Sequence, residues 1–270
     1  MLNNYLEIKK KIITNGFYLI KNFLENKDIY YLKKILDQNI QKNSKDSFIP
    51  FRTKDLINSI FSFKLENIKK NYFINRIKKK YHLKTIASNI LENKNELYAV
   101  DSYKSKKNKN MVIPWHTDQA YSGKEVVNEN EFVNPDMAAL KFFFYLSDVD
   151  SDNGCLGYIP GSHKISYYLK KLILEKKIEY SRYWSLHDYR NLVMSDYVKK
   201  KLLNYISPEE IEEFIKNSSF VDSPIKDTKL FDIEAPEGSL LIFDESGVHR
   251  GAALNKSDRL CLRFFFRKII

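Results

Sequence analysis

The triplet His116-Thr117-Asp118 places an imidazole and a carboxylate two positions apart. Side chains two positions apart in an extended chain point to the same face, so this pair converges on one point. One distant histidine would complete the facial triad that holds non-heme Fe(II) and leaves coordination positions open. His249, within the sequence Gly-Val-His-Arg-Gly, is the candidate. Because a His-x-Asp triplet also occurs by chance on solvated surfaces, the surrounding sequence decides its meaning.

The length of the chain, 270 residues, allows one large domain or two small ones. Its hydrophobic fraction of 43% and aromatic fraction of 14% allow a sizeable core, which excludes wholesale disorder. The sequence contains no internal repeat and no linker rich in Pro, Gly or Ser. We therefore expect a single domain over residues 1–270, with an oligomeric state that the sequence leaves open.

The formal net charge of +11 invites a comparison with nucleic-acid-binding proteins. The lysines, however, are scattered through the chain together with abundant Asn and Ile, a composition typical of an A/T-rich genome. The chain also lacks the aromatic-plus-basic pattern that single-strand binding needs. We therefore expect no nucleic-acid partner, and a small-molecule substrate, including an anionic one, fits the charge.

The two cysteines, Cys155 and Cys261, both lie in apolar runs typical of strands. This placement predicts buried core residues rather than a disulfide framework or a zinc cluster. The N-terminal residues lack the apolar stretch of a secretory signal, and no apolar segment is long enough to span a bilayer. We expect a reducing, cytoplasmic setting and no membrane partner.

Residues 1–96 are predicted to be mostly helical and to support the strands that follow them. Apolar residues at helical spacing predict helices over residues 2–13, 26–41 and 56–91, with a strand over 17–20. Basic clusters such as residues 76–80 are interpreted as solvated helix faces.

From residue 97 the period changes to that of short strands bounded by turns. Strands are predicted over residues 97–103, 111–116, 137–146, 155–159, 229–233, 239–243 and 259–267. Many short strands after a helical start favour an antiparallel sandwich or barrel supported by helices. The helical, lysine-rich segment of about 162–227 interrupts the strands, and it acts either as a lid that shapes the substrate site or as decoration.

Three segments together resemble the phytanoyl-CoA dioxygenase family. They are residues 116–118, the run Asp-Asn-Gly-Cys-Leu-Gly-Tyr-Ile-Pro-Gly-Ser-His-Lys at 152–164, and His-Arg-Gly at 249–251 with an arginine beyond. The resemblance extends from about residue 16 to the C-terminus. It implies a mainly β fold with flanking helices (α+β), built on a double-stranded β-helix (jelly roll, cupin-like) core over 97–270. It also implies Fe(II), 2-oxoglutarate and O₂, with the family's metal ligands matched by His116, Asp118 and His249.

An arginine after the second histidine would anchor the oxoglutarate. The distal carboxylate of oxoglutarate needs a rigid bidentate cation, which Arg supplies and Lys does not. Arg259 lies ten positions after His249 and matches the family's usual location for this residue, with Arg263 in reserve. Arg250 follows the histidine directly, so in a strand it should point the other way.

Other residues are candidates for contact with the ligands. Lys141 and Tyr103, on neighbouring predicted strands, could help to hold the co-substrate. Gln119 and Tyr121 follow the metal triplet, and Arg182 lies in the insertion, where it could meet an anionic substrate.

A few further residues have more than one interpretation. Trp115, beside the triplet, either lines the pocket or packs beneath the metal strand. His163 belongs to a Pro-Gly-Ser-His turn, for which we favour a structural or supporting role. Arg190 in the insertion could also meet an anion.

The reaction implied by the resemblance is hydroxylation of a C–H bond, with succinate and CO₂ as co-products. Related halogenases lack the carboxylate at the position of Asp118, so its presence favours hydroxylation or another oxidation over halogenation. The alternatives are a non-catalytic metal-binding jelly roll and a nucleic-acid-directed oxygenase. Against the latter, residues 259–267 lack the Arg-x-Asn-x-x-x-Arg run of nucleic-acid demethylating oxygenases. The sequence does not choose among acyl-CoA esters, amino acids and other small metabolites as substrates.

Overall fold

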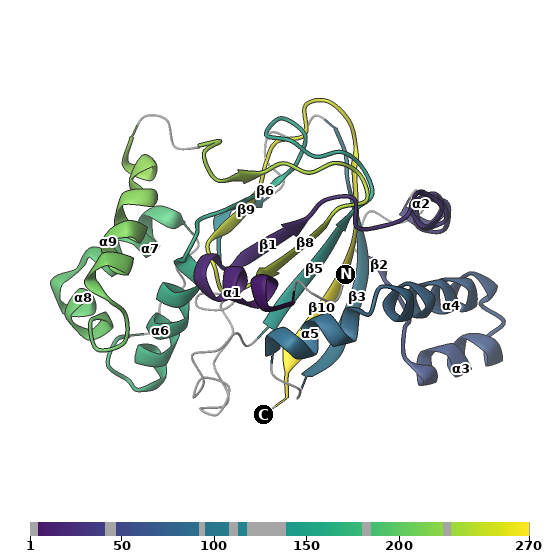
Figure 1. The fold of residues 1–270 in the computed structure, drawn as a ribbon, viewed down its shortest axis with the longest axis horizontal. Coiled ribbons are helices and arrows are strands. Elements are labelled where there is room, and N and C mark those ends of the chain that lie inside the picture. The colour runs from purple at the N-terminus through teal and green to yellow at the C-terminus, as the bar shows by residue number, and fades with distance from the viewer. Residues whose placement is uncertain are drawn as a thin grey trace.

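Two antiparallel sheets form the centre of the molecule (Figure 1). The computed structural model describes residues 5–40, 47–91, 95–107, 113–117, 139–179, 185–223 and 228–269. The large sheet has the order β1 (Phe17–Ile20), β8 (Leu240–Asp244), β5 (Ala139–Tyr145), β10 (Arg259–Lys268), β3 (Asn95–Ser105), β2 (Ser47–Phe48). The small sheet has the order β4 (Ile113–His116), β9 (His249–Gly251), β6 (Leu156–Tyr158), β7 (Asp232–Ile233).

Helices accompany the sheets in two groups (Figure 1). The first group lies in the N-terminal part of the chain, before β3, and comprises α1 (Tyr5–Asn15), α2 (Asn26–Ile40), α3 (Thr53–Phe61), α4 (Leu65–Lys80) and α5 (Leu83–Leu91). The second group lies in the insertion and comprises α6 (Ser162–Leu174), α7 (Leu186–Met194), α8 (Asp196–Leu202), α9 (Pro208–Asn217) and the 3₁₀ turn η3 (Ser219–Asp222). Among the described helices, none is long and apolar enough to cross a membrane.

The outer face of the large sheet packs against the first group of helices. In β10, Leu262, Phe264 and Phe266 point outward and are fully buried, together with Phe142 and Phe144 of β5. The same cluster contains the apolar sides of α1, α2, α4 and α5. Side chains alternate in a strand, so every second residue of β10 serves this core.

The inner faces of the two sheets enclose a second, aromatic cluster. Tyr145, Tyr158 and Phe243 meet there, and both Cys155 and Cys261 are buried among them as thiols. The prediction that the cysteines are core residues is confirmed.

The insertion has a core of its own that rests on the small sheet. Buried apolar residues of α6 to α9 pack with Trp115, Ile159 and Val248. The helix α9 begins with a capping box, in which Ser207 accepts from the Glu210 amide while the Glu210 side chain accepts from the Ser207 amide. The predicted helical segment at about 162–227 is thus a folded unit packed beside the strands.

Most expected elements are found with ends shifted by a few residues, β2 and β9 were not expected, and two expected elements differ in a larger way. The expected helix over 56–91 is divided into α3, α4 and α5, because Phe63 and His82 adopt left-handed backbone conformations (φ of 53° and 50°) that end helices. The expected strand over 229–233 shortens to β7, because the Asp232 amide donates to the Lys229 carbonyl (3.1 Å) and closes a turn. Both boundaries depend on turns that residue types alone do not specify.

Candidate metal centre

His116 and His249 lie side by side on adjacent strands of the small sheet. They are direct partners in the antiparallel pair β4–β9, and their ring centroids are 4.3 Å apart. The pairing is irregular between Ile113 and His116. Pro114 lies within this irregular stretch and has no amide hydrogen to give to a regular ladder. Two imidazoles separated by 133 positions in the chain therefore converge at one point of the molecule.

Both imidazoles are held in the same tautomer. Nδ1 of His116 is 2.7 Å from the Pro114 carbonyl oxygen, and Nδ1 of His249 is 2.8 Å from the Gly247 carbonyl oxygen. A carbonyl only accepts, so each Nδ1 must donate its hydrogen. The lone pair is thereby placed on Nε2 in both rings, which is the arrangement that a metal-ligating histidine requires.

The ring of His249 is packed on two sides by aromatic residues. Tyr158 lies nearly parallel to it, with an interplanar angle of 17° and 6.3 Å between centroids, and Phe243 lies 5.3 Å away. The Tyr158 hydroxyl donates to the Asp244 carbonyl (3.0 Å), which fixes the tyrosine. A Cβ at Gly247 would overlap this hydroxyl, so only glycine fits there. Sequence reasoning missed this packing, although Tyr158 lies in the most family-like segment.

The third predicted ligand, Asp118, lies outside the described residues, as do the predicted substrate contacts Gln119, Tyr121 and Arg182. Within the described part of the chain, no group of three His, Cys, Asp or Glu residues is positioned to hold a metal ion. The structure thus brings two of the three predicted ligands together, and the third stays a prediction from the sequence.

The inner face of β3 and β10 carries the two arginines that the sequence offers as anchors for oxoglutarate, Arg259 and Arg263. Arg263 donates from Nε and Nη2 to the two carboxylate oxygens of Asp101, at 2.6 and 2.7 Å. Its guanidinium and that of Arg259 lie 5.1 and 5.6 Å from the ring of Tyr103. The planar fork of Arg263 is therefore filled by a carboxylate of the protein's own chain.

Arg259 has a different set of contacts. It is buried and donates to the carbonyl of Gly154 and to the hydroxyl of Ser105 (3.1 Å), both neutral acceptors. Its Nε has no hydrogen-bond partner, and no carboxylate among the described residues forms an ion pair with it. A buried guanidinium that has only neutral acceptors is costly.

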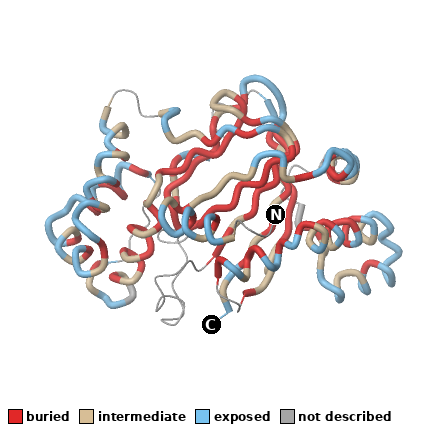
Figure 2. The backbone as a smooth tube through the Cα atoms, in the orientation of Figure 1, coloured by how far each residue is buried: buried red, intermediate tan, exposed pale blue. Residues whose placement is uncertain are grey.

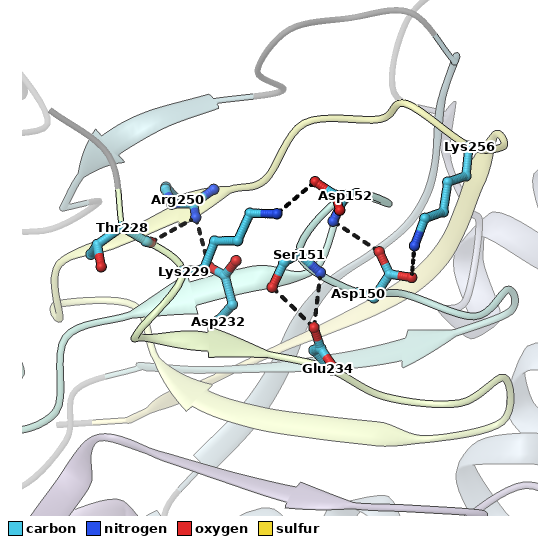
Figure 3. Close-up of polar contacts among 9 residues, drawn as sticks. All are labelled: Asp150, Ser151, Asp152, Thr228, Lys229, Asp232, Glu234, Arg250 and Lys256. Atoms are coloured by element: carbon cyan, nitrogen blue, oxygen red, sulfur yellow. Dashed lines mark hydrogen bonds and ion pairs between the residues drawn. The ribbon is translucent and has the colours of Figure 1, made fainter. Parts of the chain in front are cut away.

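The turn that presents the Gly154 carbonyl is held by polar contacts with two other loops (Figure 3). Lys229 donates to Asp152 (2.8 Å) and Lys256 donates to Asp150 (2.6 Å). Hydrogen bonding from Lys256 lowers the pKa of Asp150. Each exposed pair contributes little alone, but together they fix the turn opposite Arg259.

Arg250 points away from the histidines, as the alternation of a strand predicts. It is fully buried and donates to Asp232 (2.7 Å) and to the Thr228 carbonyl (3.0 Å), as Figure 3 shows. Its guanidinium lies 5.1 Å from the Trp115 ring. Trp115 itself is buried against the insertion, 5.6 Å from Phe220. Of the two interpretations of Trp115, the structure shows packing beneath the metal strand.

Lys141 lies on the inner face of β5, the strand that pairs directly with β10. Its ammonium is 3.8 Å from Glu245 and 6.0 Å from the ring of Phe243, which contacts His249. Its side chain is partly buried.

The comparisons with known proteins identify the family. The model of the phytanoyl-CoA dioxygenase (PhyH) family matches residues 13–263. The chain belongs to the phytanoyl-CoA dioxygenase family. A comparison with curated proteins finds no match.

Solved structures with the same fold include HygX and two enzymes of nogalamycin biosynthesis. HygX from Streptomyces hygroscopicus, solved with nickel and 2-oxoglutarate bound, is 15% identical, with 100% of this chain and 88% of that chain covered and a TM-score of 0.58. The non-heme alpha-ketoglutarate-dependent epimerase SnoN, from nogalamycin biosynthesis, is 12% identical, with coverage of 98% and 82% and a TM-score of 0.54. The carbocyclase SnoK from the same biosynthesis is 12% identical, with coverage of 97% and 83% and a TM-score of 0.55. At these identities the likeness shows a shared fold.

Two other polar residues of this phytanoyl-CoA dioxygenase family member have structural contacts. Arg190 is buried and pairs with Asp222 inside the insertion, so the interpretation that it meets an anionic substrate is wrong. His163 is buried and its Nε2 lies 3.0 Å from the Ile13 carbonyl oxygen. Burial lowers the pKa of His163 to about 4, so it stays neutral and ties α6 to α1.

Proposed function

We propose that this protein is an Fe(II)/2-oxoglutarate-dependent oxygenase that hydroxylates a C–H bond of a small molecule, with succinate and CO₂ as co-products. The observation that carries the proposal is the His116–His249 pair, whose rings lie 4.3 Å apart and whose Nδ1 atoms both donate to backbone carbonyls. This tautomer places the lone pair of each ring on Nε2. Family membership supports the same reaction class.

His116, His249 and Asp118 would hold the Fe(II). Two nitrogens and one carboxylate oxygen form the donor set that suits ferrous iron in oxygenases and leaves positions open for ligands. We interpret the two facing sheets as the double-stranded β-helix of the family, with residues 1–270 as one domain. The thiol state of Cys155 and Cys261 fits a reducing compartment, so a cytoplasmic location stays our expectation.

Arg259 would bind the distal carboxylate of 2-oxoglutarate. Its buried guanidinium has only neutral acceptors, whereas the fork of Arg263 is already filled by Asp101. Tyr103, with its ring near both arginines, and Lys141, near Phe243, would line the same co-substrate site. The contacts thus favour Arg259 over Arg263.

Bound Fe(II) with 2-oxoglutarate and O₂ supplies the oxidation itself. The chain's own part is to fix the two imidazoles, to orient the dicarboxylate, and to exclude water through the inward aromatic residues Phe143 and Phe243. Gln119, Tyr121 and Arg182 remain the candidates for substrate contact.

The substrate class is a small molecule, and an anionic one is compatible with the charge of the chain. Two similar folds bind natural products, because HygX was solved with hygromycin B and SnoN with nogalamycin RO. The same fold supports an epimerase and a carbocyclase. Product mass separates these outcomes, since hydroxylation adds one oxygen atom, cyclisation removes two hydrogens and epimerisation leaves the mass unchanged.

Anaerobic addition of Fe(II) and 2-oxoglutarate to the metal-free protein tests the proposal. We expect the weak visible charge-transfer band of the chelate, and a loss of oxoglutarate turnover of at least about a hundredfold in His116→Ala, Asp118→Ala and His249→Ala. His82, an exposed histidine on the helical side, provides the matched control, and His82→Ala should retain both signals. A band that survives unchanged in His249→Ala contradicts the assignment. A wild-type protein that binds Fe(II) but never consumes oxoglutarate supports the non-catalytic alternative.

A further inference from the structure

The turn between α3 and α4 exposes a group of large apolar side chains. Phe61 is 79% exposed, Phe63 is 88% exposed and Leu65 is 67% exposed, and they alternate along five consecutive residues. Ile57 and Ile60 of α3 are exposed beside them. We call these five residues the apolar tip. Contiguous exposed apolar groups of this kind mark interaction sites.

The helix α3 has an apolar side, with Ile57, Ile60 and Phe61, that stays exposed in the described part of the chain. Its main packing partner is α4, and Ser59 is its buried residue. Figure 2 shows α3 largely exposed, and Figure 1 shows α3 at one end of the molecule, with α4 between it and the rest of the helical core. Surface helices normally turn their apolar stripe toward a core, so the uncovered stripe points to a contact outside this chain.

The backbone of Phe63 supports the same conclusion. Its φ of 53° is left-handed, at the helix end where glycine or asparagine is the usual residue. The amide of Phe63 donates to Ile60 (3.0 Å) and that of Lys64 donates to Ser59 (2.8 Å), which closes the helix end. An aromatic residue at this conformation is strained and gains no packing inside the chain, because its side chain is exposed.

The hairpin also carries most of the net positive charge of the protein. Residues 52–80 contain nine Lys and Arg and two Asp and Glu, a net charge of +7 out of +11. Lys54, Lys64 and Lys69 are exposed around the apolar tip, and no described residue forms an ion pair with any of them. Leu65, Lys69 and Tyr72 lie on one face of α4, and all three are exposed. Moving away from the tip along this face, an apolar side chain is followed by a cationic one and then by an amphipathic one.

We propose that the α3–α4 hairpin docks on the surface of an anionic lipid bilayer. Phe61, Phe63 and Leu65 would enter the headgroup region while the surrounding lysines meet lipid phosphates. An exposed apolar tip suits a deformable bilayer, and the lysines around it disfavour a second copy of the same hairpin, which would bring like charges together. The sequence predicts no membrane partner because it has no segment that could span a bilayer. Docking on the surface of a bilayer does not require a spanning segment.

Co-sedimentation with vesicles tests this proposal independently of the oxygenase reaction. The full-length protein should pellet with vesicles of phosphatidylcholine mixed with phosphatidylserine, and stay in solution with phosphatidylcholine alone. The double variant Phe61→Ser/Phe63→Ser should bind the mixed vesicles at least about tenfold less tightly, because two aromatic side chains no longer leave water. Leu230→Ser is the control, since Leu230 is equally exposed but lies near β7.

Two further variants separate docking from general charge or from misfolding. Phe63→Gly should raise the melting temperature, because glycine suits the left-handed conformation, and yet weaken vesicle binding. Lys64→Glu with Lys69→Glu should weaken binding about fivefold for each lysine removed. Binding that survives Phe61→Ser/Phe63→Ser, or equal binding to both vesicle types, overturns the proposal. A dimer in solution that the same double variant dissociates would assign the tip to a second copy instead.

Discussion

The two faces of the large sheet differ although they are built from the same strands. On the outer face, Leu262, Phe264 and Phe266 of β10 are fully buried in an apolar core with the helices. On the inner face, the alternate residues Arg259 and Arg263 of the same strand carry charge and meet polar partners. One strand therefore supports the fold with one set of side chains and presents chemistry with the other.

Residues of one strand therefore differ in their expected roles, because alternate residues face opposite sides of the sheet. Outer-facing residues contribute mainly to stability, and inner-facing charged residues contribute mainly to ligand binding. The outer side chains gain free energy by leaving water, so their removal should affect unfolding more than activity. The charged side chains on the inner face of β10 meet polar partners, so their removal should affect ligand binding more than unfolding.

Phe264→Ala should produce the largest change in stability. The ring is fully buried and packs against Phe144, with 5.5 Å between centroids, so its removal leaves a cavity and should cost about 3–5 kcal/mol of unfolding free energy. Phe265→Ala is the matched control on the inner face, where the side chain is only partly buried. Urea unfolding measures both, and equal losses would contradict the proposed division between the faces.

Asp244 is an ionisable residue at the end of β8. It alternates with Leu240 and Ile242, which belong to the outer apolar core. Burial raises the pKa of this carboxyl to about 6. The folded state therefore keeps the proton to higher pH than the unfolded state, so stability should fall as pH rises from about 4 to about 6 and then level off, by about 3 kcal/mol. Asp244→Asn should abolish this dependence in urea unfolding followed across that range. An identical pH profile in the variant would show that Asp244 does not titrate there.

Arg259→Ala should weaken 2-oxoglutarate binding about ten- to a hundredfold, because a charge-assisted bidentate contact is lost. Arg259→Lys should not restore it, since lysine lacks the planar fork. Arg263→Ala is the control on the same face and should lower stability instead, because Asp101 loses its bidentate partner. Titration of the visible chelate band measures the affinity. A larger loss of affinity in Arg263→Ala would move the anchor to that residue.

Tyr103→Phe should have the smallest effect. The ring near both arginines is retained and only the hydroxyl is lost, so oxoglutarate affinity should fall about threefold. The same titration measures it. A loss as large as that of Arg259→Ala would make the hydroxyl a main contact of the co-substrate.

Local patterns in the sequence predicted most elements of the described structure. Strand alternation predicted that Arg250 would point away from His249, and apolar runs predicted that both cysteines would be buried. The insertion of helices within the strands also follows from the change in periodicity near residue 162. These features depend on neighbouring residues a few positions apart, which is why the sequence contains them directly.

The sequence by itself determined which residue types could form the site: two histidines, one aspartate and a choice of two arginines. Only the tertiary structure decided that Asp101 takes Arg263, 162 positions away, and leaves Arg259 with neutral acceptors. It also decided that Arg190 forms an ion pair with Asp222 inside the insertion and that Tyr158 packs on His249. The physical reason is that the choice of an ionic or aromatic partner depends on which distant strands meet, and local periodicity carries no information about that meeting.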